Sequence, residues 1–564
     1  MRNSLLDPLR RAFCIAAAAG SLLGLCSCGG GAAVVALVGG GVGTGGTGIV
    51  LGTVVGLGSV VVDGQSFSSA TPTYYSSSGG SNGETETNSQ AVEVGARVAL
   101  QLQKSGNGLQ PTTLLIQPDL EGPPVYDPNT GTLSVEGVRV SVNADPARGP
   151  VTFYSGLTGL DSGSAPAASA SQVVVHGAFG LDASGQPYIL ASLIEQVPAS
   201  KVRRLTGVVS ALGTQSVSVA GQTIPLGPQT SVLGGQGASL GVGELVHAWT
   251  DGSNWVLSVR ALGSFQGSVQ MGGIAYAIGG SGFTLSGIPV DTSGLSSVPA
   301  LQSGDYVVVS GHANGQGTLV AQSIQAAPAT LTIRGTITGY VSASSFQVRG
   351  VPIDASQAGF PAGSSAGQLG NGAYVVIQGA VSPGNPNVIS ASQVQVLSTL
   401  PTGETVDLQG TIGAVSDSSH FTLQWQAEQE GNPVSQNTTA VSVAANCAYI
   451  YVNGTPTPLA AGMAVEVEGT YQDGALSAYT IKILPSAGSG GGGSGGGSAT
   501  QEVSGRVYGW NSATSTFTLN GISLTIPAGV SIPSGFDNGA SVEVTFTPAA
   551  AGGSGTVKDL SIDN

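Results

Sequence analysis

The sequence predicts an all-β protein, built as a tandem array of small barrel modules with five or six strands each. Gly supplies 90 of the 564 residues and only 8% of residues are charged, whereas about 25% are charged in a typical soluble domain. Val, Thr, Ser and Gly prevail over Glu, Lys and Leu, which favours strands and turns. A unit of roughly 60–80 residues also recurs about seven times, which is typical of a modular array.

Each unit begins with Gly and alternating β-branched residues, passes a hairpin, and ends with two further strands. Gly335–Gly339 lead to Phe346–Val351 in one unit, and Gly505–Gly509 lead to Phe517–Ile522 in another. The short apolar runs end at Gly and a turn about every ten residues, which indicates a small closed or nearly closed barrel. A module of this size buries only about 60% of its unfolded surface. We therefore expect packing between neighbours, or a shared strand, to add stability.

The N-terminus has the layout of a secretory signal peptide. Arg2, Arg10 and Arg11 precede an apolar stretch, Ala12–Leu25, that is too short to span a membrane. Small residues follow this stretch. We assign residues 1–27 to a signal peptide.

The motif Leu25-Cys26-Ser27-Cys28-Gly29 resembles a bacterial lipobox. The resemblance implies a lipoprotein, with Cys28 as the lipid attachment site and first residue of the mature chain. Cys26 competes for this role, but it would place the bulky Leu25 before the cleaved bond. Gly29 at the next position, in place of Asp, favours the outer membrane by the sorting logic of lipoproteins. An ordinary cleaved signal with incidental cysteines is the alternative.

A Gly-rich tether, residues 28–48, leads from the signal peptide into the modules. We assign modules 1 to 7 to residues 49–119, 120–200, 201–263, 264–328, 329–400, 401–485 and 501–564. A flexible Gly/Ser linker, residues 486–500, separates the last two modules. Helical periodicity is weak throughout, and Gly interrupts every candidate helix.

Three features resemble bacterial lipoproteins that carry repeated domains of unknown function 5666. They are the tether, the entry Gly52–Gly64 and the inter-module Leu120-Glu121-Gly122-Pro123. The resemblance covers most of Gly52–Ile562, is strongest in modules 1, 2 and 5, and implies small OB-like β-barrels. It brings no catalytic residue, cofactor or established ligand. The insertions in modules 1 and 6 and the linker before module 7 depart from the family pattern.

The four histidines form no metal-binding pattern. His176 and His247 occupy the same place in the closing V-x-V-x-G strand, where other modules have Ser310, Gln378 and Glu468. A position that accepts all of these residue types indicates a solvent-facing strand site. The sequence has no His-x-His, H-E-x-x-H or Cys/His cluster, so we expect no metal, and no other cofactor is indicated.

The sequence also lacks a catalytic motif, and we expect a protein that is not an enzyme. No G-x-S-x-G stands on a strand–turn–helix pattern. Asp127 and Asp182 are explained by turn chemistry, not by calcium loops. Cys447 is expected to be a buried, inert thiol. Two acid pairs, Glu84/Glu86 and Glu428/Glu430, stand beside Gly in polar stretches, and we interpret them as loop acids. Carboxylates from distant positions can also pair for glycoside hydrolysis.

The charge distribution disfavours nucleic acid as a partner. The formal net charge is −15, and an acidic surface without a basic stripe repels phosphate backbones. The densest cationic cluster, Lys201-Val202-Arg203-Arg204, stands between two modules. We interpret it as a solvated linker.

Exposed aromatic side chains are the feature that would support saccharide binding. Trp249, Trp255, Trp425 and Trp510 lie at or near strands. Each could stack on a sugar face, since OB-like barrels bind oligosaccharides on one side. The favoured interpretation is that each Trp fills the core of its own module.

These observations lead to three functional hypotheses. The first is a lipid-anchored cell-envelope protein at the outer membrane, on its periplasmic face or at the cell surface. Its barrels would form a rod or string with a structural or interaction role. The second is an adhesin or matrix protein that binds polysaccharide through several modules. A hydrolase in one divergent module, such as module 6, is the remote third.

Overall fold

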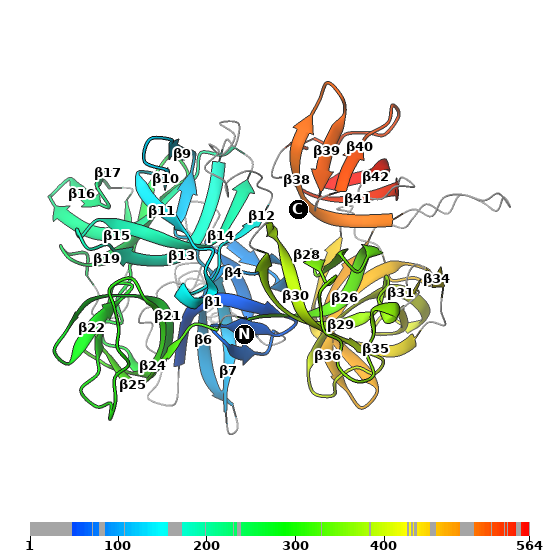
Figure 1. Cartoon of the computed structure of the whole chain (residues 1–564), viewed down its shortest axis with the longest axis horizontal. Helices are drawn as coiled ribbons and strands as arrows, with labels where there is room; N and C mark the ends of the chain where they lie inside the picture. The colour runs from blue at the N-terminus through cyan, green and yellow to red at the C-terminus, as the bar shows by residue number, and fades with distance from the viewer. Residues whose placement is uncertain are drawn as a thin grey trace, which may run out of the picture.

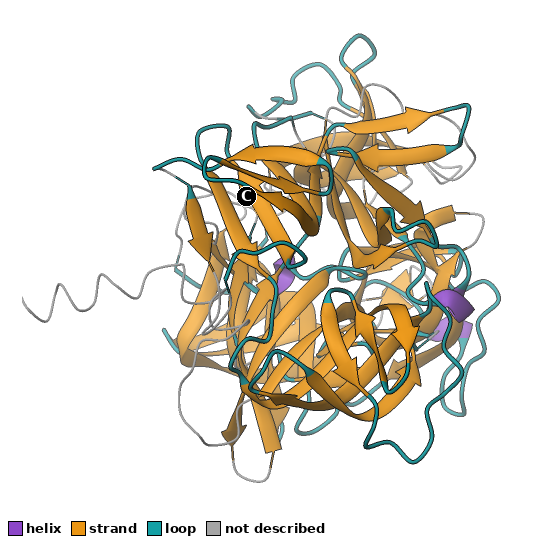
Figure 2. Cartoon of the chain, turned by 90° about the vertical axis from the view of Figure 1, so that its left-hand side faces the viewer, coloured by secondary structure: helices purple, strands orange, loops and turns teal. Residues whose placement is uncertain are grey.

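The computed structural model confirms the all-β class. It describes residues 48–69, 72–77, 85–105, 108–155, 172–197, 199–228, 230–233, 239–328, 330–382, 385–425, 428–429, 432–433, 437–451, 458–484, 501–519, 522–534, 536–537, 540–548 and 554–562. Strands dominate these ranges (Figure 2), and the helices in them are three short 3-10 turns: η1 (Ser89–Ala91), η2 (Pro146–Arg148) and η3 (Ala366–Gln368). No helix in the described part of the chain is long and apolar enough to cross a membrane.

Several sequence predictions lie outside the described residues. These are the signal peptide, Cys28, the Gly/Ser linker and the tether up to residue 47. Gly48, which we assigned to the tether, is instead the first residue of strand β1.

Module 4 shows the plan that the modules share. Its strands are β21 (Gln266–Gly279), β22 (Gly282–Leu285), β23 (Ile288–Asp291), β24 (Tyr306–Asn314) and β25 (Leu319–Ala326). They close a ring in the order β21-β22-β23-β25-β24, in which only β23 and β25 are parallel. This five-stranded Greek-key ring is an OB-like barrel.

The same ring order recurs in modules 1 to 3, with interruptions in single strands. The third strand is split in two in modules 1 to 3, and in module 2 the first strand is split as well. Module 1 contains β1 (Gly48–Leu57), β2 (Val60–Val62), β3 (Gln65–Phe67), β4 (Thr73–Ser76), β5 (Thr85–Thr87), β6 (Arg97–Ser105) and β7 (Gly108–Ile116). Module 2 contains β8 (Leu120–Gly122), β9 (Pro124–Asp127), β10 (Thr132–Val135), β11 (Val138–Val142), β12 (Phe153–Ser155), β13 (Gln172–Leu181) and β14 (Pro187–Val197). Module 3 contains β15 (Arg203–Leu212), β16 (Ser216–Val219), β17 (Gln222–Pro225), β18 (Ser231–Leu233), β19 (Leu245–Thr250) and β20 (Trp255–Val259).

Modules 5 to 7 form closed rings of five strands, and module 6 adds a short outer hairpin. Module 5 contains β26 (Leu331–Ser342), β27 (Ser345–Val348), β28 (Val351–Asp354), β29 (Tyr374–Ser382) and β30 (Asn385–Leu397). Module 6 contains β31 (Thr405–Asp417), β32 (His420–Trp425), β33 (Glu428–Gln429), β34 (Asn432–Pro433), β35 (Asn437–Tyr451), β36 (Ala464–Gln472) and β37 (Ala475–Ile483). Module 7 contains β38 (Gln501–Asn511), β39 (Thr516–Leu519), β40 (Ile522–Thr525), β41 (Ser541–Pro548) and β42 (Ser554–Ile562).

A two-residue turn joins the second and third strands in modules 1 to 5. In module 4 this turn is Ser286-Gly287, with φ values of 41° and 93°. Positive φ at both positions is the type I′ geometry that suits the twist of a tight hairpin. The non-glycine member occupies the equivalent position in the other four of these modules, where modules 1, 2, 3 and 5 have Asp63, Glu136, Ala220 and Arg349.

The modules contact one another out of chain order. Residues 48–51 of β1 pair in parallel with residues 268–271 of β21, and Gly56 and Leu57 pair with Thr332 and Ile333 of β26. In Figure 1, the blue strands of module 1 accordingly lie between the green strands of module 4 and the yellow-green strands of module 5. The predicted rod or string is therefore wrong for modules 1, 4 and 5, because one strand of module 1 bridges both partners.

The hydrophobic cores also cross module borders. One continuous cluster joins modules 1 and 5 and includes Phe153 and Leu193 of module 2. A second cluster joins modules 2 and 3 and includes Tyr276 of module 4. Burial of apolar surface is the main stabilising term in folding, so these modules stabilise one another as we expected of small barrels.

Candidate functional site

A groove lies on one face of the module 2 barrel. OB-folds bind their ligands on the face of the second and third strands, between the loops that join strands 1–2 and 4–5. In module 2 the second and third strands are β10 and β11, and these loops are residues 128–131 and 182–186. A hollow of about 590 Å³ occupies this face. Its polar and aromatic lining includes Tyr126, Thr132, Arg139, Ser141, Arg148, Asp182, Tyr188 and Ser303.

Module 4 supplies the opposite wall of the groove. A second hollow of about 430 Å³ lies between η2 and residues 299–307 of module 4. It shares Arg148, Ser303 and Gly304 with the first hollow. The two hollows therefore adjoin and form one extended groove, which we call the module 2–4 groove.

Arg139 stands at the centre of the first hollow. On β11 the side chains alternate, so that Val138 and Val140 are buried in the barrel and Arg139 faces the groove. The Arg139 guanidinium lies 3.0 Å from the Asp182 carboxylate and 5.2 Å from the centre of the Tyr188 ring. A cation over an aromatic face is attracted by the ring quadrupole. Salt bridge and stacking together hold Arg139 in one orientation.

A well-bonded loop carries Arg148 into the groove. The buried Asn143 side chain donates hydrogen bonds to the carbonyl oxygens of Gly149 and Pro150, at 3.1 and 2.9 Å. Asp145 caps η2 by accepting a 3.0 Å hydrogen bond from the backbone N–H of Ala147. Gly149 has φ 123°, and a Cβ there would lie 2.7 Å from the Cβ of Tyr306 in module 4. Only glycine permits this approach, so the loop is fixed against module 4.

The electrostatics of the groove are set by these contacts. Burial raises the pKa of the Tyr188 phenol, and the positive charges of Arg139 and Arg148 oppose this shift. Hydrogen bonds from the Ser184 hydroxyl and the Gln186 backbone N–H lower the pKa of Asp182, and Arg139 adds to this effect. At neutral pH the groove thus presents a neutral phenol, an ionised Asp182 and two guanidinium groups.

Comparison with known protein families identifies part of the chain. A family model described as "Domain of unknown function (DUF5666)" matches residues 206–253, 273–325, 334–395 and 409–482. The chain contains repeated DUF5666 domains. The matched segments lie in modules 3 to 6. No curated protein matches the chain.

The DUF5666 modules and their neighbours are joined by buried charges. Arg204 of module 3 has an exposed fraction of 0%, and its guanidinium lies 3.5 Å from the carboxylate of Glu121 in module 2. The same guanidinium hydrogen-bonds to Ser77 of module 1 and, at 3.2 Å, to His247. Our interpretation of Lys201–Arg204 as a solvated linker is therefore wrong for Arg204, because two neighbouring modules cover it.

The prediction of a solvent-facing histidine position is also wrong. His176, His247 and Glu468 are buried, with exposed fractions of 3%, 2% and 2%. His176 Nδ1 accepts a 3.1 Å hydrogen bond from the backbone N–H of Arg97 in module 1. Another module covers this outer strand position in each case, whereas Gln378 at the equivalent position of module 5 is exposed. Burial, followed by the charges of Arg260 and Arg204, lowers the pKa of His247 well below its usual value.

A third buried network joins modules 5 and 6. Arg349, the turn residue of module 5, lies 2.6 Å from Asp407 and 3.2 Å from Glu468 of module 6. Ser69 and Ser89 of module 1 also donate hydrogen bonds to Glu468. The Glu468 carboxylate thus links modules 1, 5 and 6.

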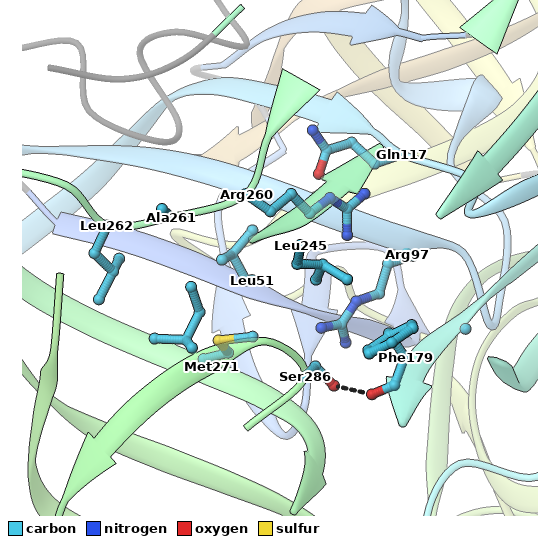
Figure 3. Close-up of a pocket in the computed structure, with 12 residues that line it drawn as sticks. Leu51, Arg97, Gln117, Phe179, Leu245, Arg260, Ala261, Leu262, Met271 and Ser286 are labelled. Carbon is cyan, nitrogen blue, oxygen red and sulfur yellow. Dashed lines mark hydrogen bonds between the residues drawn. The ribbon is translucent and has the colours of Figure 1, made fainter. Parts of the chain in front are cut away.

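A small enclosed cavity lies where modules 1 to 4 meet. Figure 3 shows Arg97 and Arg260 there among apolar side chains such as Leu51, Leu245 and Met271. The cavity measures about 30 Å³, which accommodates a water molecule but no organic ligand. We therefore regard it as part of the module junction and the module 2–4 groove as the candidate site.

The remaining sequence candidates lie away from the groove or have structural roles. Trp425 is buried in the core of module 6, and Trp510 packs against the core of module 7. Both positions agree with the prediction that each Trp packs into its own module. Trp255 packs at the shared core of modules 2 and 3, and Trp249 lies beside Arg204, 5.9 Å from its guanidinium. Glu86 and Glu428 lie in β5 and β33, not in loops, and Glu84 and Glu430 lie outside the described residues.

Cys447 and the two turn aspartates behave as structural residues. Cys447 is only partly buried, and this burial raises the pKa of its thiol to about 11. Asp127 accepts hydrogen bonds from Asn129 and Thr130, and Asp182 from Ser184 and Gln186, which confirms turn chemistry at both. Among the described residues, no group of three His, Cys, Asp or Glu side chains could hold a metal ion.

Sequence reasoning did not identify the groove residues. Tyr126, Arg139, Arg148 and Tyr188 come from β9, β11, η2 and β14, and they form no local motif. Assigning the OB strand order to module 2 would have found them, since it places these strands and loops on the ligand-binding face.

Proposed function

We propose that this protein is a lipid-anchored component of the bacterial cell envelope with a structural or interaction role and no catalytic activity. The module 2–4 groove is where it binds its partner. The observation that carries this proposal is the place of the groove, on the face that OB-folds use for ligands. The anchor is the lipid on Cys28, and the location is the outer membrane.

The way the modules are joined supports an interaction role. Strand pairing, shared cores and buried charges fix module 2 and module 4 against module 1. Both walls of the groove are therefore held in place before a ligand arrives, and preorganisation of this kind favours affinity.

The groove itself supports binding over catalysis. Its two acids, Asp182 and Asp305, accept hydrogen bonds from backbone N–H groups of their own turns. Acids committed to turn geometry are poor proton donors for hydrolysis, because their charged form is the one stabilised. Hydrolysis in a divergent module remains the remote alternative.

Polysaccharide is the partner class that the groove favours. The half-buried Tyr126 offers aromatic surface, and Thr132, Ser141 and Ser303 offer hydroxyl groups. Rings that stack and hydroxyls that exchange hydrogen bonds suit a sugar chain. If the chain lies on the outer surface of the cell, this function is that of a surface adhesin or matrix protein.

Retardation in native gels cast with a panel of polysaccharides tests the binding role. We expect at least one polysaccharide to slow the mature chain, and Tyr126→Ala to reduce the effect. Tyr449→Ala is the matched control, because Tyr449 is exposed in module 6, away from the groove. If no polysaccharide in a broad panel retards the chain, the hypothesis of polysaccharide binding is excluded.

Detergent partitioning of cell extracts tests the anchor. The native chain is expected in the detergent phase and the Cys28→Ser variant in the aqueous phase. Protease treatment of intact and lysed cells then separates the cell surface from the periplasmic face. A native chain that stays in the aqueous phase would exclude the lipid anchor.

A further inference from the structure

From the charges that line the module 2–4 groove we infer that its ligand is an acidic saccharide, a sugar chain that carries carboxylate groups. This inference rests on the proposed binding role of the groove. It follows from three features of the groove: the state of its two arginines, the state of its two acids, and the shape of the hollow.

The first feature is that both arginines have unused donors. Arg148 is exposed, and no hydrogen bond or salt bridge joins its side chain to another described residue. Arg139 is bound to Asp182 through Nη2, while its buried Nε has no hydrogen-bond partner among the described residues. The Nε atom is shielded from solvent and lies out of a ligand's reach. The Arg139 side chain as a whole is 42% exposed, which leaves the outer part of its guanidinium open to a ligand oxygen in the groove.

The second feature is that the acids of the groove are already engaged. The Asp182 Oδ1 atom accepts three hydrogen bonds, from the backbone N–H groups of Ser184 and Gln186 and from the Ser184 hydroxyl, at 2.7–2.9 Å. The Asp305 carboxylate accepts one from the backbone N–H of Gln302 at 2.7 Å. These contacts hold both carboxylates in their turns. Asp182 partly neutralises Arg139, so Arg148 is the guanidinium of the groove that no acid among the described residues pairs with.

Arginine also selects for the shape of the anion. Its planar fork matches a carboxylate through two parallel hydrogen bonds, which a lysine cannot form. The whole chain has only 16 Lys and Arg against 31 Asp and Glu. Two arginines on one ligand-binding face are therefore unusual in a chain in which acidic residues outnumber basic ones.

The third feature is the extended and hydroxyl-rich shape of the groove. Two adjoining hollows of about 590 and 430 Å³ accommodate a run of linked rings better than a single small anion. Ser and Thr hydroxyls also line the first hollow. A nucleic acid would require a basic track that contacts several successive phosphates, and two arginines do not supply one.

Calorimetric titration of the mature chain tests the inference with three probes. They are hexagalacturonate, which carries carboxylates, maltohexaose, which is uncharged, and a short oligodeoxythymidylate. We expect hexagalacturonate to bind at least roughly tenfold more tightly than either other probe, because charge-assisted hydrogen bonds are the strong ones.

Variants assign the effect to the groove. Arg148→Gln and Arg139→Gln should each weaken hexagalacturonate binding by roughly tenfold. Lys201→Gln, at an exposed position of the junction between modules 2 and 3, should leave binding unchanged. Equal melting temperatures of Arg148→Gln and the native chain would confirm that the loss is not unfolding.

The outcomes separate the inference from the proposed function. Equal binding of maltohexaose and hexagalacturonate would overturn the acidic ligand and leave a saccharide-binding groove. No binding of either saccharide would overturn both. Tighter binding of the oligonucleotide, or unchanged hexagalacturonate binding in Arg148→Gln, would also overturn the inference.

Discussion

The guanidinium of Arg204, fully removed from solvent, lies 3.5 Å from the carboxylate of Glu121 in the preceding module. Burial opposes both charges: it lowers the pKa of Arg204 and raises that of Glu121, and each partner counteracts the shift of the other. Each charge therefore needs the other while modules 2 and 3 are docked, because docking removes both from water. This contact joins the stability of one module to that of the next.

Removal of Arg204 tests this junction. Arg204→Met leaves the Glu121 carboxylate buried without its counter-charge, which should lower the free energy of unfolding by about 3–5 kcal/mol. Urea unfolding followed by tryptophan fluorescence measures the loss. The control is Arg203→Met, because Arg203 and its partner Glu136 are partly exposed; its loss should stay below about 1 kcal/mol. Equal losses in the two variants would show that the buried pair has no special role.

The pH dependence of stability tests the junction of modules 1 and 4. Asp63 accepts a 2.8 Å hydrogen bond from Tyr306, and burial raises its pKa from 3.8 to about 6 against the charge of Arg97. The folded state thus binds this proton more tightly than the unfolded state. Stability should fall by about 3 kcal/mol as the pH rises from about 4 to about 6, and level off above that.

Asp63→Asn should remove this part of the pH dependence. Asn tolerates the positive φ of 47° at this position and can still accept from Tyr306. Melting temperatures of both proteins between pH 4 and pH 7 give the two slopes. Parallel slopes in the native chain and the variant would contradict the assignment to Asp63.

Close approach of modules 2 and 4 depends on Gly149. Gly149→Ala places a Cβ 2.7 Å from the Cβ of Tyr306, at a φ of 123°. Backbone strain and the clash together should cost about 1–3 kcal/mol in unfolding experiments. Gly221→Ala is the matched control, since Gly221 also has a positive φ of 81° but has no neighbouring atom within 4 Å of the added Cβ. If Gly149→Ala lowers the free energy of unfolding no more than Gly221→Ala does, the contact with Tyr306 does not require glycine.

Loss of Asp182 should strengthen hexagalacturonate binding, whereas loss of Arg139 should weaken it. Asp182→Asn removes the charge that neutralises Arg139, while the Asn side-chain oxygen can still accept the turn hydrogen bonds. Affinity for hexagalacturonate should rise roughly two- to fivefold, the size of an exposed ion pair. Asp251→Asn changes a similar turn in module 3 and should have no effect. Weaker binding in Asp182→Asn would contradict the proposed role of Arg139.

Local pattern was sufficient to predict the barrels. The alternation of Phe283, Leu285, Ile288 and Val290 around the Ser286-Gly287 turn specifies a hairpin with one buried face. The same pattern recurs along the chain, so the all-β class and the small barrel size follow from sequence. The fold of a single module depends mainly on contacts within that module.

The environment of the polar residues could not be predicted in this way. Arg204 meets Ser77, 127 positions away, and Ser69 meets Tyr479, 410 positions away. Such contacts depend on the order in which barrels pack, and a strand pattern carries no information about that order. Residues that look solvent-facing in an isolated module, such as His176 and His247, are therefore buried in the assembled chain.

The candidate site was missed for a related reason. Arg139, Arg148 and Tyr188 come together only through the ring order of module 2 and the approach of module 4. Sequence reasoning searched for tryptophan platforms, and Trp425 and Trp510 proved to pack against module cores. Tyrosine and arginine from separate strands leave no local signature.

Hydrogen–deuterium exchange of the mature chain, with and without saturating hexagalacturonate, would show whether the saccharide binds in the module 2–4 groove. We expect slower exchange at residues 126–148 and 181–190 of module 2 and at residues 302–306 of module 4, which line the groove. The other described segments should exchange as before. Protection confined to other modules, or no change at the groove under conditions where the saccharide binds, would contradict binding in this groove.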